Sequence, residues 1–288
     1  LGLGEALGEP PREPREDEPH VSLHVRMDQD VCTLSLDTSG ETLHKRGYRE
    51  SGHPAPLKET LAAAILQFAG YDGSQPFLDP MCGSGTLAIE AAMIAVRKAP
   101  QIHRRKGEFA FEWLKDFDRE LWRQTQDRVR AEKLDAPPAP VMASDIDPAF
   151  VAMARKSALS ARVERYITFD TRRIQDVEPP APHGLLVTNL PYGERIGGRE
   201  ADLRPLYEEI GDVLKQRFAG WRAVLLAASA SPWKSIGLKP TRSPALMNGS
   251  IPCRLLHYEL YSGSRRTPKQ EGRPQAPLGA TRGNAVSG

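Results

Sequence analysis

The stretch Phe77–Ala92, FLDPMCGSGTLAIEAA, decides the fold because it joins a short apolar strand, a glycine turn and an apolar helical run. Asp79 ends the strand, and Gly83, Ser84 and Gly85 form the turn into the helix. Glycines let a backbone approach a ligand closely, and the start of a helix offers unpaired N–H donors. Ligands of open α/β sheets bind at such turns, at the carboxyl edge of the sheet. The stretch therefore predicts a ligand-binding strand, turn and helix.

Outside this stretch, apolar strand segments alternate with helical segments. Leu57, Leu61, Ile65 and Phe68 recur at helical spacing, and Gly70 follows them as a stop signal. The alternation is typical of the α/β class, with a mostly parallel sheet covered by helices on both faces. The expected strands are 76–80, 141–145, 165–169, 184–189 and 221–229, and the expected helices are 53–70, 85–98, 148–163 and 203–218.

Two hairpins are expected in addition to the parallel strands. Residues 20–40 alternate apolar and polar residues on both sides of DQD (28–30), which predicts two strands joined by a turn. Asn248 and Gly249 lie between extended stretches of 245–260 and predict an antiparallel hairpin near the end of the sheet.

The two ends of the chain have the composition of disordered segments, because Pro, Gly and charged residues replace apolar ones. The expected organisation is a linker at 1–19, a hairpin unit and connector at 20–40, an α/β domain at 41–261 and a basic tail at 262–288.

Composition argues against a membrane protein and leaves a nucleic-acid partner open. The longest apolar runs, such as 223–228, fall far short of the roughly 20 residues that cross a bilayer. The net charge is only +2, although the stretches 97–107 and 264–273 are locally basic. The three cysteines have no paired spacing, which favours a reducing compartment, here the cytoplasm, and no zinc site.

The acidic residues indicate which ligand the glycine turn holds. Gly83, Gly85 and Ala88 also fit a loose dinucleotide pattern, but a dinucleotide fold needs a ribose-binding acid about 20 residues further on. Arg105 stands at that spacing, and the next acid at a strand end is Asp145 in SDIDP. A nicotinamide-dependent oxidoreductase is therefore disfavoured.

S-adenosylmethionine fits these residues better than a dinucleotide. Asp79 suits its cationic methionine end, Asp145 can accept from its ribose hydroxyls, and the apolar Ile146 suits its adenine. Asp147 also fits the N-cap of the next helix, with Pro148 at the first helical position.

The stretch TNLPYGERIG, Thr188–Gly197, places an amide, a proline and an aromatic ring at the end of a buried strand. The exocyclic amine of a nucleobase is a poor nucleophile, because its lone pair is delocalised into the ring. Acceptance of its N–H bonds by the Asn189 side-chain oxygen and the Leu190 carbonyl would stabilise the charge developing on nitrogen. Pro191 fixes the backbone, and Tyr192 offers a face on which a splayed base can stack. These four are the predicted catalytic residues; the alternative is an ordinary turn after a strand.

Several ordered motifs resemble one family, the THUMP-associated N2-guanine RNA methyltransferases, and within it most closely the group of ribosomal RNA large subunit methyltransferase L. The resemblance covers about residues 30–260 and rests on TNLPYGERIG, SDIDP and the motifs at 43–66, 79–95 and 248–260. It implies a Rossmann-like class I methyltransferase with a mostly parallel seven-stranded sheet and a C-terminal antiparallel hairpin. S-adenosyl-L-methionine is the implied cofactor, and a guanosine N2 amine in RNA the implied acceptor. We expect 23S ribosomal RNA as substrate, with transfer RNA as the alternative.

The resemblance also completes the set of expected site residues. The expected cofactor-binding residues are Asp79, Pro80, Cys82, Gly83, Ser84, Gly85, Asp145, Ile146, Asp147, Asp170 and Asn189. The expected RNA contacts are Lys45, Arg46, Arg49, Arg104, Arg105 and Arg195. No metal and no membrane partner is expected.

The chain departs from the family pattern in three places. The family usually has Asn-Pro-Pro-Tyr, but Leu190 stands here, and its backbone carbonyl can still act as an acceptor. The family's adenine-binding acid aligns with Arg173, so Asp170 or Asp176 is the expected substitute. A THUMP domain precedes the catalytic domain in the family, and residues 20–36 resemble only its last piece.

Two further functions stay open. An adenine-N6 DNA methyltransferase uses the same acceptor chemistry, although GERIG and HKRGYR resemble the RNA family. A noncatalytic RNA-binding protein could keep the fold, but binding alone does not require Asn189, Pro191 and Tyr192 together.

Overall fold

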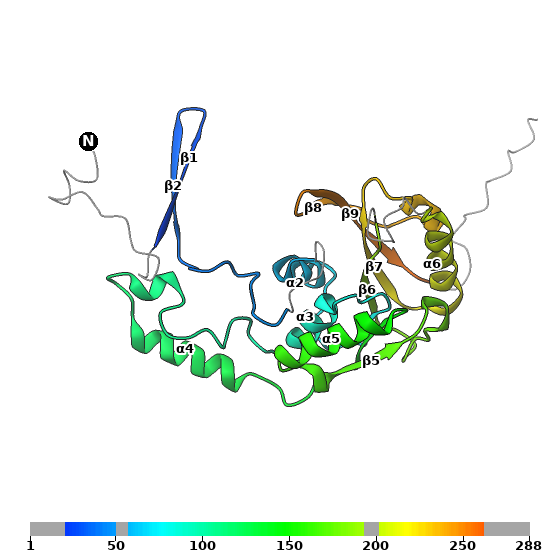
Figure 1. Cartoon of the computed structure of the whole chain (residues 1–288), viewed down its shortest axis with the longest axis horizontal. Coiled ribbons are helices and arrows are strands. Elements are labelled where there is room, and N and C mark those ends of the chain that lie inside the picture. The colour runs from blue at the N-terminus through cyan, green and yellow to red at the C-terminus, as the bar shows by residue number, and fades with distance from the viewer. Residues whose placement is uncertain (1–20, 50–56, 193–201, 262–288) are drawn as a thin grey trace, which may run out of the picture.

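The computed structural model describes residues 21–49, 57–192 and 202–261, which form the predicted α/β fold (Figure 1). Seven strands make one sheet in the order β5-β4-β3-β6-β7-β9-β8. Neighbours from β5 to β7 are parallel, whereas β9 is antiparallel to both β7 and β8. The predicted mostly parallel seven-stranded sheet, with its C-terminal antiparallel hairpin, is confirmed.

The elements follow the predicted alternation along the chain. The sheet strands are β3 (Phe77–Asp79), β4 (Val141–Asp145), β5 (Ile167–Thr171), β6 (Leu185–Asn189), β7 (Arg222–Ala228), β8 (Ala245–Asn248) and β9 (Ile251–Glu259). The helices are α2 (Glu59–Phe68), α3 (Thr86–Ala95), α4 (Arg119–Ala131), α5 (Pro148–Ser160) and α6 (Arg204–Arg217). Short 3-10 helices are η1 (Ala110–Trp113), η2 (Glu164–Tyr166), η3 (Ile174–Asp176) and η5 (Trp233–Ile236).

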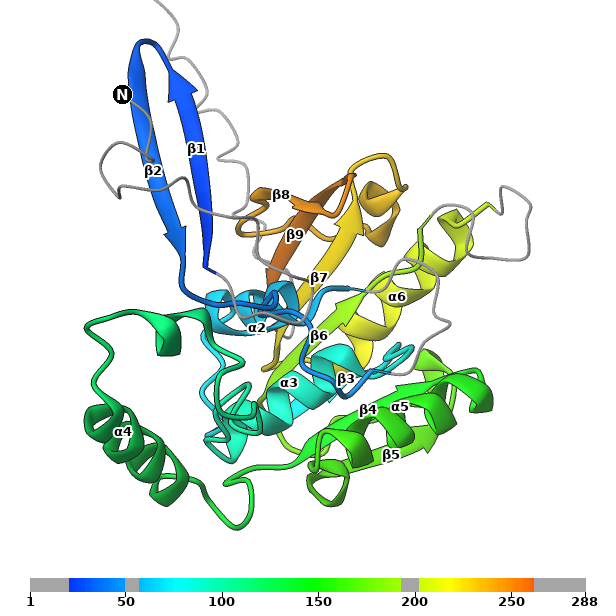
Figure 2. The same ribbon diagram turned by 60° about the vertical axis from the view of Figure 1, so that its left-hand side comes forward.

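The sheet is buried on both faces, which explains why its strands are almost continuously apolar. Leu185 and Val187 of β6 point into the core beneath α2, α3 and α5. Leu186, one residue out of phase, points into the second core beneath α6. Figure 2 shows these helices on opposite sides of the sheet.

Three helices end in the same hydrogen-bonded turn, in which two backbone N–H groups beyond the helix bond back into its last turn. Gly70 closes α2 with a φ of 69°, as predicted. Arg97 and Arg162 occupy the equivalent position after α3 and α5, with φ of 52° and 56°. Because these two helices lack the usual glycine signal, the sequence placed both of their ends three residues too late.

The hairpin at 20–40 is confirmed as β1 (Ser22–Asp28) and β2 (Val31–Asp37). Gln29 and Asp30 both have positive φ, as a two-residue hairpin turn with right-handed strand twist requires. The hairpin stands apart from the sheet (Figures 1 and 2), and its apolar side chains share one exposed face.

The second predicted hairpin forms with a one-residue correction. Asn248 pairs with Ile251 as the last residue of β8, so the turn residues are Gly249 and Ser250. Gly249 has the positive φ, 62°, that the first position of such a turn favours. The Asn248 side chain is therefore buried instead of lying in the turn.

The predicted disordered segments 1–19 and 262–288 lie outside the described residues. None of the helices within the described ranges has both the length and the apolar character to span a bilayer. Cys32, Cys82 and Cys253 are all free thiols.

Candidate active site

The candidate site lies where the chain reverses its direction across the sheet. From β3 the chain continues to β4 and β5 on one side, and β6 leads to β7 on the other. Such a switch point leaves a crevice at the carboxyl ends of the two central strands. Asp79 ends β3, and Thr188 and Asn189 end β6. The Thr188 hydroxyl donates a 2.7 Å hydrogen bond to Asp79, which ties the two strand ends together.

The glycine turn after β3 is fixed by the neighbouring strand. Asp145 accepts a 2.9 Å hydrogen bond from the Gly83 N–H, and the Ser144 carbonyl accepts one of 2.9 Å from the Cys82 N–H. Gly85 has a φ of 82°, and a Cβ there would lie 2.8 Å from the Ala154 Cβ of α5. Gly85 is therefore required by backbone conformation and by the close approach of α5.

The two helices that begin at this edge differ in how they are capped. Asp147 accepts a 2.8 Å hydrogen bond from the Ala149 N–H, so the predicted N-cap of α5 is confirmed. Gly85, the N-cap of α3, has no side chain to do the same. The first N–H groups of an uncapped helix are donors for a ligand. The α3 terminus therefore keeps donors available beside the glycine turn.

Burial dominates the electrostatics of the turn. Asp79 is 1% exposed, and burial raises its pKa to about 7 despite the hydrogen bonds from Thr188 and the Met81 N–H. A cation bound at this edge would favour the ionised form of Asp79. Burial also raises the pKa of Cys82 well above its ordinary value, so this residue is a neutral thiol and no nucleophile. Pro80 and Ser84 are buried as well.

Three elements hold the NLPY segment in place. The Leu190 N–H donates to the Leu226 carbonyl of β7 at 2.9 Å. The Tyr207 hydroxyl of α6 donates to the Pro191 carbonyl at 3.0 Å. The Asn248 side-chain amide donates to the Tyr192 hydroxyl at 2.7 Å. The sequence did not indicate this last contact, because Asn248 was interpreted only as part of a hairpin turn.

Asn189 differs from the three residues that follow it, which all form hydrogen bonds with neighbouring elements. Its side-chain oxygen is buried and has no hydrogen-bond partner. Leaving such an acceptor unpaired costs about 1–3 kcal/mol, so a buried polar atom of this kind calls for a functional explanation. The atom belongs to the end of β6, beside the end of β3 and its glycine turn. A donor group of a ligand bound over the turn would satisfy it.

Leu190 and Tyr192, the other two residues of NLPY predicted to face the substrate, are both buried in the structure. The Leu190 side chain is fully buried, so only its backbone can face a substrate. Tyr192 is 5% exposed and its hydroxyl is engaged by Asn248. Its ring is thus a packed part of the site in this structure and not the open stacking surface that the sequence suggested.

Three acids are predicted to contact the adenosine part of the cofactor. Asp145 lies at the end of β4, next to Ile146, whose apolar side chain is 65% exposed. Asp170, on the adjacent strand β5, forms an ion pair with Arg172. Asp176 is exposed in η3. An exposed apolar side chain beside an acid at a sheet edge suits a nucleoside, which has an apolar ring and a polar ribose.

The structure assigns structural roles to three of the predicted RNA contacts. Arg46 forms a 2.6 Å ion pair with Glu90, with side chains only 9% and 2% exposed. Arg49 donates to the Leu57 carbonyl at 2.6 Å, and Arg104 donates to the carbonyls of Ser39 and Glu41 at 2.7 Å each. These guanidinium groups form bonds within the protein, and their contact with RNA stays a prediction; Arg104 also lines a surface hollow.

Of the remaining predicted RNA contacts, two are exposed and one lies outside the described residues. Lys45 is exposed and pairs with Glu41 at 2.7 Å. Arg105 is exposed and lines a surface hollow together with Lys106. Arg195 lies outside the described residues. Across the described ranges, no group of three His, Cys, Asp or Glu side chains is placed to hold a metal ion.

Comparisons with known proteins agree with this geometry. Residues 46–257 match the model of the family UPF0020, described as the RMKL-like methyltransferase domain. A protein of Synechocystis sp. named as an RNA methyltransferase is 40% identical over 245 residues, which cover 85% of this chain and 63% of that protein. Ribosomal RNA large subunit methyltransferase K/L of Vibrio campbellii is 40% identical over 253 residues, which cover 85% of this chain and 35% of that protein. The chain therefore spans less than two thirds of the length of these relatives.

Solved structures give the same fold. The methyltransferase SMU.472, crystallised in complex with SAH, has a TM-score of 0.76 at 30% identity, over 92% of this chain and 68% of that one. A protein of Listeria monocytogenes, predicted to be an N6-adenine-specific DNA methylase, has a TM-score of 0.70 at 33% identity, over 82% of this chain and 60% of that one.

Proposed function

Since the chain belongs to the UPF0020 family of RMKL-like methyltransferase domains, we propose that it methylates the exocyclic N2 amine of a guanosine in RNA. S-adenosylmethionine is the cofactor of this domain. It supplies, when bound, an electrophilic methyl group on a sulfonium. The Vibrio campbellii relative is named for ribosomal RNA of the large subunit, which makes 23S ribosomal RNA the first candidate substrate.

The residues of the carboxyl edge fit this cofactor. The glycine turn and the uncapped start of α3 offer backbone donors, and buried Asp79 suits a positive charge nearby. Asp145 and exposed Ile146 match the ribose and the adenine. We propose the remaining predicted residues of the turn, Pro80, Cys82 and Ser84, as the wall of this site.

The single observation that carries the proposed reaction is the unpaired Asn189 oxygen at the end of β6. In the proposed step, this oxygen and the Leu190 carbonyl accept the two N–H bonds of the target amine. Both acceptors stabilise the positive charge that grows on nitrogen as the methyl group is transferred. Pro191 and the bonds around it hold the two acceptors at fixed positions, so little reorganisation is needed. Other described side chains, such as Ser157 and Tyr258, also have a buried hydroxyl without a partner, but Asn189 supplies the one amide oxygen of this kind in the described residues.

The hairpin β1–β2 is proposed to be the last piece of a THUMP-type RNA-binding domain, followed by the methyltransferase domain at 41–261. Support comes from its separation from the sheet and from its exposed apolar face, which includes Leu23, Val25 and Leu34.

Transfer of radioactive methyl groups to 23S ribosomal RNA, bulk transfer RNA and DNA, followed by nucleoside analysis, tests the proposal. N2-methylguanosine in ribosomal RNA is the expected product. N2-methylguanosine only in transfer RNA would change the substrate and keep the chemistry. N6-methyladenine in DNA would support the second candidate function, which the similarity to the Listeria protein keeps open.

A further inference from the structure

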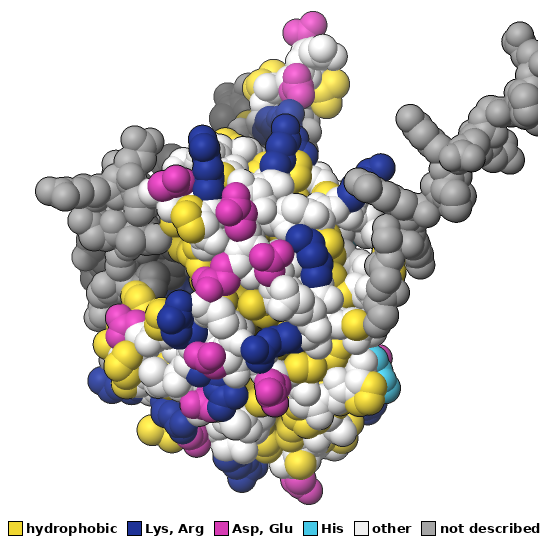
Figure 3. Space-filling view, turned by 90° about the vertical axis from the view of Figure 1, so that its right-hand side faces the viewer, with side chains coloured by type: hydrophobic (Ala, Val, Ile, Leu, Met, Phe, Trp, Pro, Cys, Tyr) yellow, Lys and Arg dark blue, Asp and Glu magenta, His cyan; other side chains and the backbone are white. Residues whose placement is uncertain are grey.

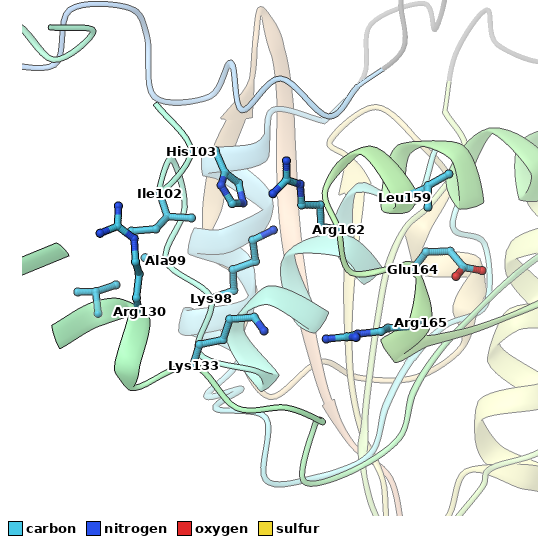
Figure 4. Close-up of a pocket in the computed structure, with 11 residues that line it drawn as sticks. Lys98, Ala99, Ile102, His103, Arg130, Lys133, Leu159, Arg162, Glu164 and Arg165 are labelled. Atoms are coloured by element: carbon cyan, nitrogen blue, oxygen red, sulfur yellow. The ribbon is translucent and has the colours of Figure 1, made fainter. Parts of the chain in front are cut away.

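A second cavity lies far from the candidate active site. It has a volume of about 600 Å³ and lies between the segment after α3, the end of α4 and the turn from α5 to β5 (Figure 4). Both α3 and α5 start at the carboxyl edge of the sheet, so their ends mark the amino edge. The 13 residues of α5 correspond to roughly 20 Å at 1.5 Å per residue. The cavity is therefore about one helix length away from the glycine turn.

Five of the eleven residues lining this cavity are lysines or arginines. They are Lys98, Arg130, Lys133, Arg162 and Arg165, against the single carboxylate of Glu164. Figure 4 shows Lys133 and Arg165 pointing toward one another, whereas Glu164 points away from them. Glu164 lies 3.4 Å from Arg155, which does not line the cavity. The cavity therefore has a strong excess of positive charge.

Most of these cations lack an acidic partner. Arg130 pairs with Asp127 at 3.2 Å, but Lys98, Lys133, Arg162 and Arg165 form no ion pair with any residue in the described ranges. This separates them from Arg46, Arg49 and Arg104, which the protein uses internally. Cations gathered around a cavity without counter-charge attract anions.

Local backbone structure and side-chain contacts fix the positions of the cationic groups. Arg162 occupies the left-handed position that closes α5, and the Lys98 ammonium donates to the neighbouring Ala161 carbonyl. Arg165 and Lys133 both lie over the ring of Tyr166, at 4.7 and 5.9 Å from its centre. The ring thus contacts two of the cations that line the cavity.

Burial and the neighbouring positive charges lower the pKa values of two groups that line the cavity. The pKa of Lys98 is lowered by burial and by Arg162 and Lys133. The pKa of His103, at the rim, is lowered by burial and by Lys98, Arg162 and Arg130. A bound anion would relieve the repulsion between these charges.

The positive surface extends beyond the cavity, which points to an elongated ligand. Arg130 also lines a second hollow of about 510 Å³, where six cationic side chains face only two carboxylates, those of Glu112 and Glu120. The face over α6, in contrast, mixes cationic and acidic side chains (Figure 3). Two basic hollows that share one arginine suit successive phosphates of a chain better than a single small anion.

We propose that this cavity at the amino edge binds the phosphodiester backbone of RNA, as a second contact about 20 Å from the methyl-transfer site. The proposal rests on the proposed function insofar as RNA is the substrate. The cavity would supply RNA contacts in addition to the predicted arginines at 46, 49 and 104, which form ion pairs or hydrogen bonds within the protein. An RNA segment that occupies both places would be held in one orientation relative to Asn189.

The test compares two double variants that remove equal charge from the full chain. Lys133→Gln/Arg162→Gln empties the cavity of two cations, and Arg217→Gln/Lys239→Gln removes two exposed cations elsewhere. Binding of a labelled 20-nucleotide single-stranded RNA is measured by fluorescence anisotropy over a salt series. Each lost phosphate contact lowers the slope of log K against log salt by about 0.7, so the cavity variant is expected to lose about 1.4. Its dissociation constant is expected to rise about tenfold at low salt, with the control near the parent.

Three results would overturn the proposal. One is an equal change of slope in both variants, which would mean that only net charge matters. The second is an unchanged slope in the cavity variant. The third is saturable binding of inorganic pyrophosphate that depends on Lys133 and Arg162 while RNA binding does not, which would assign the cavity to a small anion. Cofactor affinity of the three proteins and methyl transfer by the parent report separately on the proposed function, because neither depends on the loss of Lys133 and Arg162.

Discussion

The ends of β4 and β6 carry polar side chains in opposite states. Both carboxylate oxygens of Asp145 are used within the protein, one by the Gly83 N–H at 2.9 Å and the other by the Asp147 N–H at 3.0 Å. The Asn189 oxygen, at the same edge of the sheet, has no partner. A polar group with partners builds the site, whereas one without partners is available to a ligand.

The same distinction separates the arginines. Arg46 and Arg49 in HKRGYR are joined to Glu90 and to the Leu57 carbonyl, so they shape the connector before α2. Arg162 has no ion-pair partner in the described ranges and lines a cavity. For residues away from the carboxyl edge, the comparison predicts that changes at partnered residues act mainly on stability and that changes at unpartnered residues act mainly on binding.

The largest expected effect is at the buried ion pair. Arg46→Met leaves Glu90 buried without its counter-charge, and such losses cost about 3–5 kcal/mol of unfolding free energy. Lys45→Met, its exposed neighbour, should cost less than about 1 kcal/mol. Urea unfolding of both variants measures the difference. Equal stability of the two variants, with RNA binding lost only in Arg46→Met, would return Arg46 to the RNA-binding residues.

Asp79 should make the stability of the protein depend on pH. Its folded pKa of about 7 lies above the ordinary value of 3.8, because of burial. The stability linked to this group is therefore fully present below about pH 4 and is lost as the pH rises through 7. We expect the parent to lose stability between pH 5.5 and 8, and Asp79→Asn to lose about 2 kcal/mol less over that range. Melting temperatures across the range test this, and parallel profiles of the two proteins would argue against it.

Asp145 is expected to matter for cofactor binding as well as for the turn. Asp145→Ala removes an acceptor for the ribose and releases Gly83, and should weaken S-adenosylmethionine binding by about 1.5–3 kcal/mol. Asp147→Ala is the matched control, because it removes an N-cap worth about 1 kcal/mol of stability and leaves the turn intact. Calorimetry on both folded variants measures their affinity for S-adenosylmethionine. Unaltered affinity in Asp145→Ala would remove this residue from the cofactor site.

The smallest predicted effect concerns the contact between Asn248 and Tyr192. Tyr192→Phe and Asn248→Leu each break the same 2.7 Å hydrogen bond, and we expect either to slow methyl transfer about three- to tenfold with cofactor affinity unchanged. The double variant should be little worse than either single one, with a coupling of about 1 kcal/mol. Additive effects would show that the two residues act independently.

The sequence could place the strands and the glycine turn because each is specified by neighbouring residues. Phe77–Asp79 and Val141–Asp145 are apolar runs closed by an acid, and both form strands where predicted. The ends of α3 and α5 were missed because Arg97 and Arg162 take a position where glycine is usual. The roles of Arg46 and Asn248 depend on partners 44 and 56 residues away, which no local pattern reveals. Partners at such distances, and the lack of one at Asn189, are properties of the folded chain.

Single-turnover methyl transfer by Asn189→Ala, at saturating S-adenosylmethionine and RNA, tests the central claim most directly. Thr188→Val is the control, because it removes a neighbouring hydrogen bond to Asp79 without touching the proposed acceptor. Loss of an acceptor that acts only as charge develops should slow transfer about a hundredfold or more, with cofactor affinity and melting temperature near those of the parent. Thr188→Val should lower stability and retain most of the rate. A folded Asn189→Ala protein that methylates guanosine at the parental rate would contradict the account.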